Sequence, residues 1–539
     1  MSASNLESYD CPKKSMRQLL LFLLISSGHY SLFGQTDQEL IRQTLDQFIE
    51  GTVYNYPDKV ASVFYPDTRM FLYNGSDTAW VVSSETYASW YGRRVPGTLN
   101  NRINEIKTIE VVGDVAYARL QVDVPSFGNR YSDLMLLKKI QGTWKIVGKA
   151  TSATPIPKTA RELKANPKKE TVITGLNRPW SMAFLHEEEA IIAEKDGDLL
   201  WVNLRSGERS VLGGLPDGVA RKVKVDTAAH AFGIFPPQAH GQERSFNAGW
   251  FQVLLDPNFD KNCWVYVSYA SENENRQSAL KVIRGQLVGK TLTQIETLFL
   301  AGPYSHGLFH YGGGMIFGPD GKLYITTGER NLFELNNPPL PLAQDLTDPR
   351  GKVIRLNPDG SIPGDNPDFG PNAVSGLYAA GIQAAQGLTL HPQTNQLWFS
   401  EHGTIRGDEL NLLKPGVNYG WPYRTSGKYR TADYLPDVPE DHIFEDPVYF
   451  WDQTVAPTGL TFYTGREFPQ WLGNLIVPGL SKGSLWRMEL ENGEVVAAEE
   501  LFINDRVRLR KAIQSPGGQL YLLTDEQEGR LIRVFNSSR

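Results

Sequence analysis

Residues 313–330 read GGMIFGPDGKLYITTGER, and this unit determines the fold of most of the 539-residue chain. An alternating apolar run, a turn built on Pro-Asp-Gly and a second apolar run are typical of two short antiparallel strands. The unit recurs five more times, with copies that begin at Trp180, Trp250, Gln386, Thr458 and Ala512. Strand–turn–strand units spaced 54 to 73 residues apart predict a six-bladed β-propeller, so the fold class is mainly β.

The composition is that of a folded protein and excludes several classes of function. The apolar fraction is 41% and the charged fraction 21%, which is enough for a packed core. The net charge of −6 gives no indication of a nucleic-acid partner. The two cysteines, Cys11 and Cys263, are too few for a disulfide scaffold or a cysteine-ligated cluster. We expect Cys263 to be a lone, buried thiol.

The N-terminus has the pattern of a secretory signal over residues 1–34. Basic residues precede the apolar run 19–25, which is too short to span a membrane. The sequence therefore predicts a periplasmic or secreted protein without a membrane span, with cleavage near Gly34. Met16 offers an alternative start, which would make residues 1–15 an over-extended N-terminus.

A small α+β domain is predicted over residues 36–153. The sequence Thr36-Asp-Gln-Glu39 has capping-box spacing before an amphipathic helix that Gly51 can end, and a second helix is predicted over 57–64. Four segments with period-two alternation follow, which indicates an antiparallel meander: 102–111, 115–124, 132–139 and 143–151. Residues 154–169 are predicted to be a linker, and residues 170–539 the propeller.

The order of helices and strands in the small domain resembles the SnoaL-like cone, the fold shared with nuclear transport factor 2. The segment contains no histidine, so acid–base chemistry there would depend on carboxylates such as Asp46 or Asp133. An accessory or dimerisation role is the stronger expectation, which makes a homodimer one expected assembly.

The propeller segment resembles a known enzyme family in several motifs. They include the stretches HYGGGMIFGPDG at 310–321, GKVIRLNPDGSIPGDNP at 351–367, EHG at 401–403, GDELN at 407–411, NYGWP at 418–422 and TVAP at 454–457. Together they resemble the glucose/sorbosone dehydrogenase family, the soluble quinoprotein sugar dehydrogenases, over about residues 176–535.

The resemblance implies an enzyme that oxidises an aldose at C1 to a lactone. Members of the family bind pyrroloquinoline quinone (PQQ) and Ca²⁺ at the propeller mouth. A general base takes the hydroxyl proton while the hydride moves to the quinone, and electrons pass to an external acceptor. The implied partners are a small-molecule sugar and that acceptor.

Carried over by motif, the resemblance assigns candidate site residues. His310 matches the catalytic base, and Glu329 aligns with an aspartate near it. The residues implied in binding PQQ are Arg508, Arg510, Thr454, Gln383, Lys482 and His402. Those implied in binding Ca²⁺ are Gly403, Thr404, Glu409 and Tyr419, with backbone carbonyls contributed by Gly403 and Tyr419.

The sequence departs from the family pattern at Gln383-Ala384, where the family has Arg-Asn. That arginine lies beside the reacting quinone carbonyl, where negative charge develops. An alternative hypothesis is therefore a non-redox propeller that binds carbohydrate or another ligand at the same mouth, with a degenerate quinone site. A third hypothesis is different chemistry that uses His310 with a metal.

Overall fold

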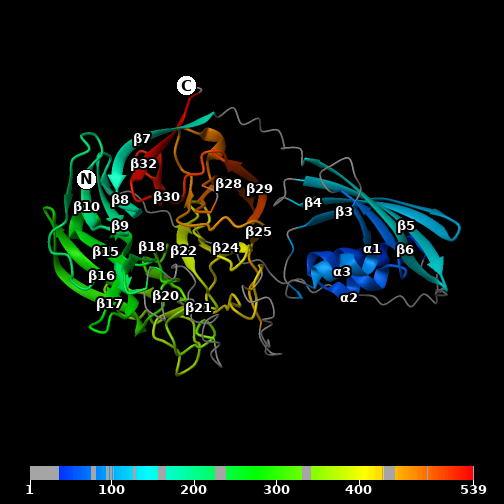
Figure 1. Ribbon diagram of the computed structural model, residues 1–539, viewed down its shortest axis with the longest axis horizontal. Coiled ribbons are helices and arrows are strands. Elements are labelled where there is room, and N and C mark those ends of the chain that lie inside the picture. The colour runs from blue at the N-terminus through cyan, green and yellow to red at the C-terminus, as the bar shows by residue number, and fades with distance from the viewer. Residues whose placement is uncertain are drawn as a thin grey trace, which may run out of the picture.

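The computed structural model describes residues 36–73, 80–92, 96–97, 100, 102–124, 129–155, 166–224, 238, 240–330, 341–427, 429, 443–481 and 483–537. The predicted signal segment, most of the linker and Lys482 lie outside these ranges. The described chain forms a small α+β unit and a larger all-β unit, which lie side by side (Figure 1).

The small unit begins with α1 (Asp37–Val53). The predicted capping box is confirmed, because the Thr36 side chain accepts the Glu39 N–H and the Glu39 carboxylate accepts the Thr36 N–H. Gly51 does not end the helix; it lies inside the last turn, where a Cβ would lie 2.8 Å from the Val60 side chain. Its role is the close approach of α1 to α2 (Pro57–Val63).

Six strands of the small unit form one curved sheet in the order β2-β1-β6-β5-β4-β3. Their bounds are β1 (Arg69–Leu72), β2 (Trp80–Ser83), β3 (Ile103–Val112), β4 (Val115–Val124), β5 (Asn129–Ile140) and β6 (Thr143–Pro155). The two helices and α3 (Ser84–Tyr91) cover one face and bury a core around Phe48, Leu120 and Trp144 (Figure 1). The predicted meander is confirmed; β1, β2 and α3 were not predicted.

The larger unit is a propeller of six four-stranded sheets. Blade 1 contains β8 (Pro179–His186), β9 (Glu189–Glu194), β10 (Leu199–Asn203) and β11 (Arg209–Val211); blade 2 contains β14 (Trp250–Leu255), β15 (Trp264–Glu272), β16 (Ser278–Val288) and β17 (Thr291–Ser305). Blade 3 contains β18 (Gly312–Phe317), β19 (Leu323–Thr327), β20 (Lys352–Leu356) and β21 (Leu377–Ala380); blade 4 contains β22 (Ala385–Leu390), β23 (Leu397–Glu401), β24 (Asp408–Leu412) and β25 (Tyr449–Trp451). Blade 5 contains β26 (Thr461–Phe462), β27 (Leu475–Pro478), β28 (Leu485–Glu491) and β29 (Glu494–Leu501). Blade 6 contains β30 (Leu509–Gln514), β31 (Leu520–Thr524), β32 (Gly529–Asn536) and β7 (Pro167–Leu176).

Each predicted repeat coincides with the first strand of a blade, so the six-bladed propeller is confirmed. The ring closes because β7, from the start of the propeller segment, pairs antiparallel with β32 from its end. Outside the blades the described chain has a short pair, β12 (Lys222–Lys224) with β13 (Glu243–Ser245), and two short helical turns, α5 (Phe259–Asn262) and η3 (Pro469–Trp471).

Buried hydroxyl groups join neighbouring blades near the centre of the ring. Ser181 donates to the carbonyl of Phe251 at 2.7 Å, and Ser268 donates to that of Gly313 at 2.6 Å. Similar bonds run from Thr326, Ser400 and Thr458 to the next blade in each case. Because the backbone groups they satisfy are buried, these bonds fix the positions of the inner strands that carry the site.

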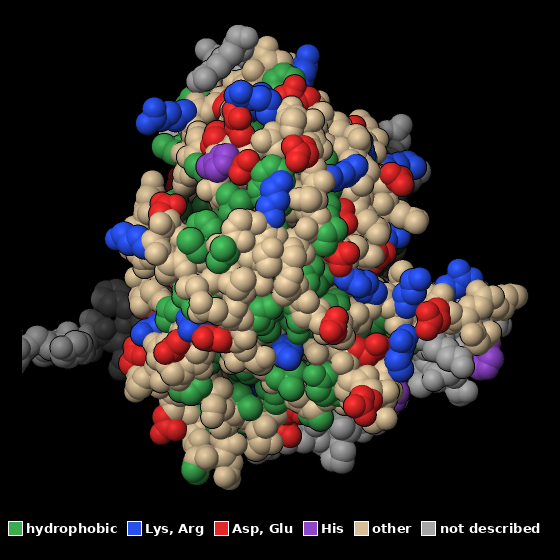
Figure 2. Space-filling view, turned by 90° about the vertical axis from the view of Figure 1, so that its left-hand side faces the viewer, with side chains coloured by type: hydrophobic (Ala, Val, Ile, Leu, Met, Phe, Trp, Pro, Cys, Tyr) green, Lys and Arg blue, Asp and Glu red, His purple; other side chains and the backbone are tan. Residues whose placement is uncertain are grey.

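The expectation of a buried Cys263 is wrong. Cys263 follows α5 as its C-cap, with a left-handed φ of 56°, and its side chain is exposed. On the propeller side shown in Figure 2, acidic and basic side chains are interspersed. No helix among the described residues is long and apolar enough to cross a membrane.

Candidate active site

The centre of the site is a histidine–glutamate pair on blade 3. His310 precedes β18 and Glu329 follows β19, so both lie at the same end of two paired strands. Nδ1 of His310 lies 2.7 Å from Oε1 of Glu329, and the two side chains are 13% and 2% exposed. A carboxylate at Nδ1 favours the tautomer with the proton on Nδ1, which leaves Nε2 able to accept a proton.

The backbone around this pair is held in an unusual conformation. His310 has a left-handed φ of 47°, which is uncommon for a residue with a side chain. A Cβ on Gly328 would lie 2.1 Å from the His310 carbonyl oxygen, so only glycine fits there. Strain of this kind is frequent at functional sites, where the surrounding structure maintains it.

Arg330 fixes the segment that carries His310. The side chain is buried, and Nε donates to the Phe309 carbonyl at 3.0 Å while Nη1 donates to the Ser278 carbonyl at 2.8 Å. Nη2 donates to the Gly307 carbonyl, and the guanidinium lies 3.7 Å from the centre of the Tyr311 ring. One buried side chain therefore joins the segment before β18 to blade 2.

Gln383 connects the histidine pair to a second carboxylate. Its carbonyl accepts the Glu329 N–H at 2.9 Å, and its own N–H donates to the Glu401 carboxylate. The same Glu401 oxygen accepts the Ala384 N–H at 3.2 Å. Gln383 and Ala384, the residues that replace the family's Arg-Asn, are both buried next to the catalytic candidates.

His402 lies beside this group with an unsatisfied nitrogen. Nε2 of His402 has no hydrogen-bond partner among the described residues, although the atom is buried. Burial, together with the neighbouring His310 and Arg510, lowers the pKa of His402 to about 3. The ring is therefore neutral at physiological pH, and its free nitrogen is available to a bound group.

A buried aspartate holds together two loops at the mouth. Oδ1 of Asp408 accepts the Gly403 N–H at 2.8 Å, and Oδ2 accepts the N–H groups of Val455 and Ala456 at 2.7 and 2.8 Å. These bonds place Gly403 and the adjacent Thr404 opposite the segment that begins with the exposed Thr454. Three sequence-predicted ligand residues are thus brought to one place.

Glu409 lies directly opposite Glu401 in the antiparallel pairing of β23 with β24. Both line a small cavity of about 10 Å³ together with Gln383, His402 and Tyr419. Burial raises the pKa of Glu401, and the nearby Glu409 raises it further. Burial likewise raises the pKa of Glu409. Two adjacent buried carboxylates create excess negative charge that a cation or a proton would offset.

Arg508 and Arg510 share one carboxylate, that of Asp525. Arg508 is 50% exposed and donates from Nε and Nη2 to Oδ2 at 3.0 and 2.8 Å. Arg510 is only 4% exposed; its Nη2 lies 3.1 Å from Oδ1 and its Nη1 donates to Gln386 at 2.8 Å. Nearby cations, Arg510 first among them, hold the pKa of Asp525 well below its usual range although burial opposes this. Arg508 is therefore the arginine of the two that presents its charge to solvent.

Hydrogen bonds and ion pairs thus join the described candidate site residues into a few groups. Lys482 lies outside the described residues. Sequence reasoning assigned no role to Arg330, Glu401, Asp408 or Asp525. Glu401 and Asp408 lie inside the EHG and GDELN motifs, and Arg330 directly follows Glu329, so the sequence did place these three residues near candidate site residues. No sequence pattern pointed to Asp525, because its contacts are remote in sequence.

The donor set fits the two groups that the fold family implies. Ca²⁺ prefers carboxylate and carbonyl oxygens, which suits the Glu401–Glu409 cavity and the loop at Gly403 and Thr404. No cluster of three or more His, Cys, Asp or Glu side chains in the described ranges has metal-site geometry, so backbone carbonyls would have to contribute. The solvent-facing Arg508 suits a carboxylate of PQQ.

The fold and the site together define a class of protein. It comprises six-bladed propellers in which a carboxylate orients a histidine at the end of two strands of one blade. Residues 176–533 match the Glucose / Sorbosone dehydrogenase family, and residues 36–151 match the Putative lumazine-binding family. The chain belongs to the glucose/sorbosone dehydrogenase family.

Similar proteins agree with this assignment. The chain is 31% identical to aldose sugar dehydrogenase YliI of Escherichia coli, over 67% of this chain and 90% of that one. It is 27% identical to quinoprotein glucose dehydrogenase B of Acinetobacter calcoaceticus, over 68% and 87%. The PQQ-bound aldose sugar dehydrogenase of Streptomyces coelicolor superposes with a TM-score of 0.52 at 26% identity, over 69% of this chain and 98% of that one.

Proposed function

We propose that this chain is a quinoprotein that oxidises an aldose at C1 to a lactone with PQQ and Ca²⁺, and passes the electrons to an external acceptor. The observation that carries the proposal is the 2.7 Å contact between His310 and Glu329 at the end of β18 and β19, in a chain of this family. The small unit is proposed to be a separate domain, and residues 1–34 an export signal.

His310 would act as the general base. With the Nδ1 proton directed at Glu329, Nε2 accepts the proton of the C1 hydroxyl as the C–H bond breaks. The Glu329 carboxylate keeps the ring in this tautomer and stabilises the imidazolium that forms. PQQ, when bound, would supply the two-electron acceptor for the hydride from C1.

Other residues would bind PQQ and Ca²⁺ and hold them in orientation. Arg508 would pair with a PQQ carboxylate, with Thr454, Lys482, Gln383 and His402 as further contacts and Arg510 holding Asp525 in place. The carbonyls of Gly403 and Thr404 would hold the Ca²⁺ next to PQQ. Glu409 and the Tyr419 carbonyl would hold a second Ca²⁺, with Glu401 facing Glu409 across the strands.

One observation favours the alternative of a non-redox propeller. Gln383 and Ala384 are buried at the position of the family's Arg-Asn and place no positive charge there. The experiment is dye reduction over a panel of aldoses by metal-stripped protein after addition of PQQ and Ca²⁺. Turnover that His310→Asn abolishes and the surface control His186→Asn retains would support the dehydrogenase. Sugar binding without turnover would support the alternative.

A further inference from the structure

A hydrogen bond between two described residues joins the small unit to the propeller. Nη2 of Arg424 donates to the carbonyl of Gly97 at 2.8 Å, across 327 positions of the chain. Arg424 lies in the long connection between β24 and β25 of blade 4, and its side chain is only 16% exposed. Figure 1 shows the small unit beside this part of the propeller. Arg424 is therefore a point of contact between the two units.

On the small unit, the acceptor carbonyl belongs to a turn that is fixed to the end of α1. The Gly97 N–H donates to the Tyr54 carbonyl, and the Asn100 N–H donates to the Val53 carbonyl, both at 2.6 Å. The last carbonyls of a helix lack partners within the helix, so these bonds satisfy groups that would otherwise be free. Gly97 has a left-handed φ of 85°, which favours glycine. The carbonyl that Arg424 uses thus has a defined position.

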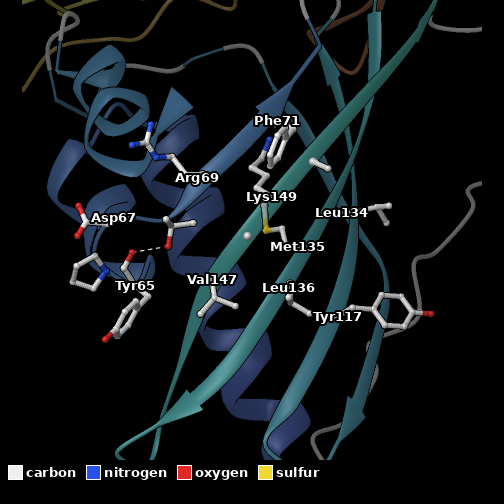
Figure 3. A pocket seen from close by; sticks show the side chains of 14 residues that line it. Tyr65, Asp67, Arg69, Phe71, Tyr117, Leu134, Met135, Leu136, Val147 and Lys149 are labelled. Carbon is white, nitrogen blue, oxygen red and sulfur yellow. Dashed lines mark hydrogen bonds between the residues drawn. The ribbon is translucent and has the colours of Figure 1, made fainter. Parts of the chain in front are cut away.

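The contact uses the helical side of the small unit and not the open face of its sheet. Figure 3 shows that face, with Phe71, Leu134 and Tyr117 along a broad groove. Phe71 and Leu134 are still 52% and 51% exposed with the two units in contact. Docking at Gly97 therefore leaves the groove accessible.

On the propeller, the Arg424 guanidinium also binds its own loop. Nη1 donates to the Phe444 carbonyl at 3.3 Å, and Nη2 pairs with the carboxylate of Asp446. A planar guanidinium can hold several acceptors at once, which a lysine ammonium on a flexible stem cannot do in the same geometry. One side chain therefore ties the loop before β25 to the small unit.

The same guanidinium belongs to the wall of the Glu401–Glu409 cavity. Arg424 lines this cavity together with both carboxylates. Burial raises the pKa of Glu409, whereas the nearby Arg424 charge lowers it. Two residues further on, the Ser426 N–H donates to Oε1 of Glu409 at 3.2 Å. Arg424 therefore interacts both with the buried carboxylates and with the small unit.

We propose that the small unit docks on the propeller of its own chain at Arg424, and that a divalent cation in the Glu401–Glu409 cavity strengthens this docking. The effect of the cation rests on the proposed function, in which Glu409 holds a Ca²⁺. A bound dication offsets the carboxylate charge that attracts the guanidinium to the cavity, and it repels the guanidinium. Arg424 is then left to Asp446 and to the Gly97 carbonyl.

The short connection between the units makes a contact of this size sufficient. β6 ends at Pro155 and β7 begins at Pro167, so residues 156–166 join the two units. Units joined over a short linker are present to each other at an effective concentration of about millimolar. A contact that would be too weak for separate proteins is therefore populated within one chain, and a modest change in its strength changes the docked fraction.

The test follows the distance between the units in the full-length protein by pulsed electron paramagnetic resonance. In a background of Cys11→Ser and Cys263→Ser, spin labels are placed at Val112→Cys on the small unit and Val496→Cys on blade 5. These side chains are 75% and 43% exposed, so the labels should not disturb either core. We expect one narrow distance distribution with Ca²⁺ bound and a broader one after the metal is removed.

One variant on each side of the contact tests the docking. Arg424→Lys keeps the charge beside the cavity but loses the fork, and it should lower the ratio of docked to undocked protein by about tenfold or more. Gly97→Val, which strains the turn, should have the same effect. The controls are Arg276→Lys at an exposed arginine and Gly142→Val at a hairpin glycine with a similar φ of 80°. Wild-type protein with the same distribution as Arg424→Lys and Gly97→Val would overturn the docking.

Calcium affinity gives an independent readout of the coupling. By linkage, Gly97→Val should weaken Ca²⁺ binding by the factor by which Ca²⁺ strengthens docking, about fivefold or more. Titration calorimetry of metal-stripped protein without PQQ measures this factor. Ca²⁺ binding that leaves the distance distribution unchanged would overturn the coupling. Absence of Ca²⁺ binding would contradict the metal site of the proposed function and the coupling with it, while the comparison of wild type with Arg424→Lys would still decide the docking.

Discussion

His310 and Glu329 are held 2.7 Å apart by the ends of two adjacent strands of one blade, so the base and the group that orients it move as a unit. We predict that Glu329→Gln lowers kcat by about 100-fold or more, because the amide neither stabilises the imidazolium nor enforces the tautomer. Steady-state kinetics would show KM nearly unchanged. Exposed Glu494→Gln is the control; an equal loss there, or none at Glu329, would contradict the assignment.

Asp408→Asn should loosen the mouth of the propeller. The Asp408 carboxylate accepts three backbone N–H groups, and an amide can satisfy them only in part. A lost hydrogen bond to a charged group costs about 2 kcal/mol. We expect a lower unfolding midpoint in urea and Ca²⁺ affinity reduced about tenfold or more, a change of about 1.4 kcal/mol. Asp260→Asn, at an exposed aspartate, should change neither quantity.

Arg330→Lys should disturb the same site indirectly, by weakening the buried contacts that hold the His310 segment. A lysine ammonium cannot reach the carbonyls of Gly307, Phe309 and Ser278 together, so buried acceptors lose their donors. The expected result is a loss of about 2 kcal/mol or more in the free energy of unfolding, together with a lower kcat. Arg205→Lys at the surface is the matched control. Full stability of Arg330→Lys would show that the contacts are dispensable.

Lys511 gives a prediction on pH. Burial lowers its pKa to about 8 in the folded chain, against 10.5 for an ordinary lysine, and among the described residues its ammonium donates to Gln252 alone. The unfolded chain binds more protons between these two values, so stability rises with pH across that window. Lys511→Met should therefore stabilise the protein at pH 7, by about 1–3 kcal/mol.

That gain should decrease as the pH approaches 10, where the folded wild-type lysine is already neutral. Thermal unfolding of both proteins at several pH values measures it, with exposed Lys261→Met as the control. A gain that is independent of pH would mean that folding leaves the pKa of Lys511 unchanged, and it would contradict the prediction.

The propeller could be predicted from the sequence because each blade repeats one local signal. The Gly313 copy and its five relatives all begin at innermost strands. In the small unit the long alternating strands were predictable, whereas β1 and β2 are only 4 residues each and carry too little periodicity. Glycine at position 51 resembled a helix end, but it serves interhelical packing.

The site was less predictable because its contacts are remote in the chain. Asp408 bonds to residues 47 and 48 positions away, and no local pattern indicates such a contact. The period-two spacing of Arg508 and Arg510 suggested equal roles. Only the structure shows that Arg510 is buried against the Trp180 ring while Arg508 faces solvent.

The mouth of this propeller is proposed to bind a quinone. The most direct measurement is equilibrium titration of metal-stripped protein with PQQ, followed by absorbance, with and without Ca²⁺. We predict saturable binding of one PQQ per chain that requires Ca²⁺ and is weakened at least tenfold by Arg508→Ala. No saturable binding to the folded protein in the presence of Ca²⁺ would contradict the claim and would indicate a propeller whose ligand is not a quinone.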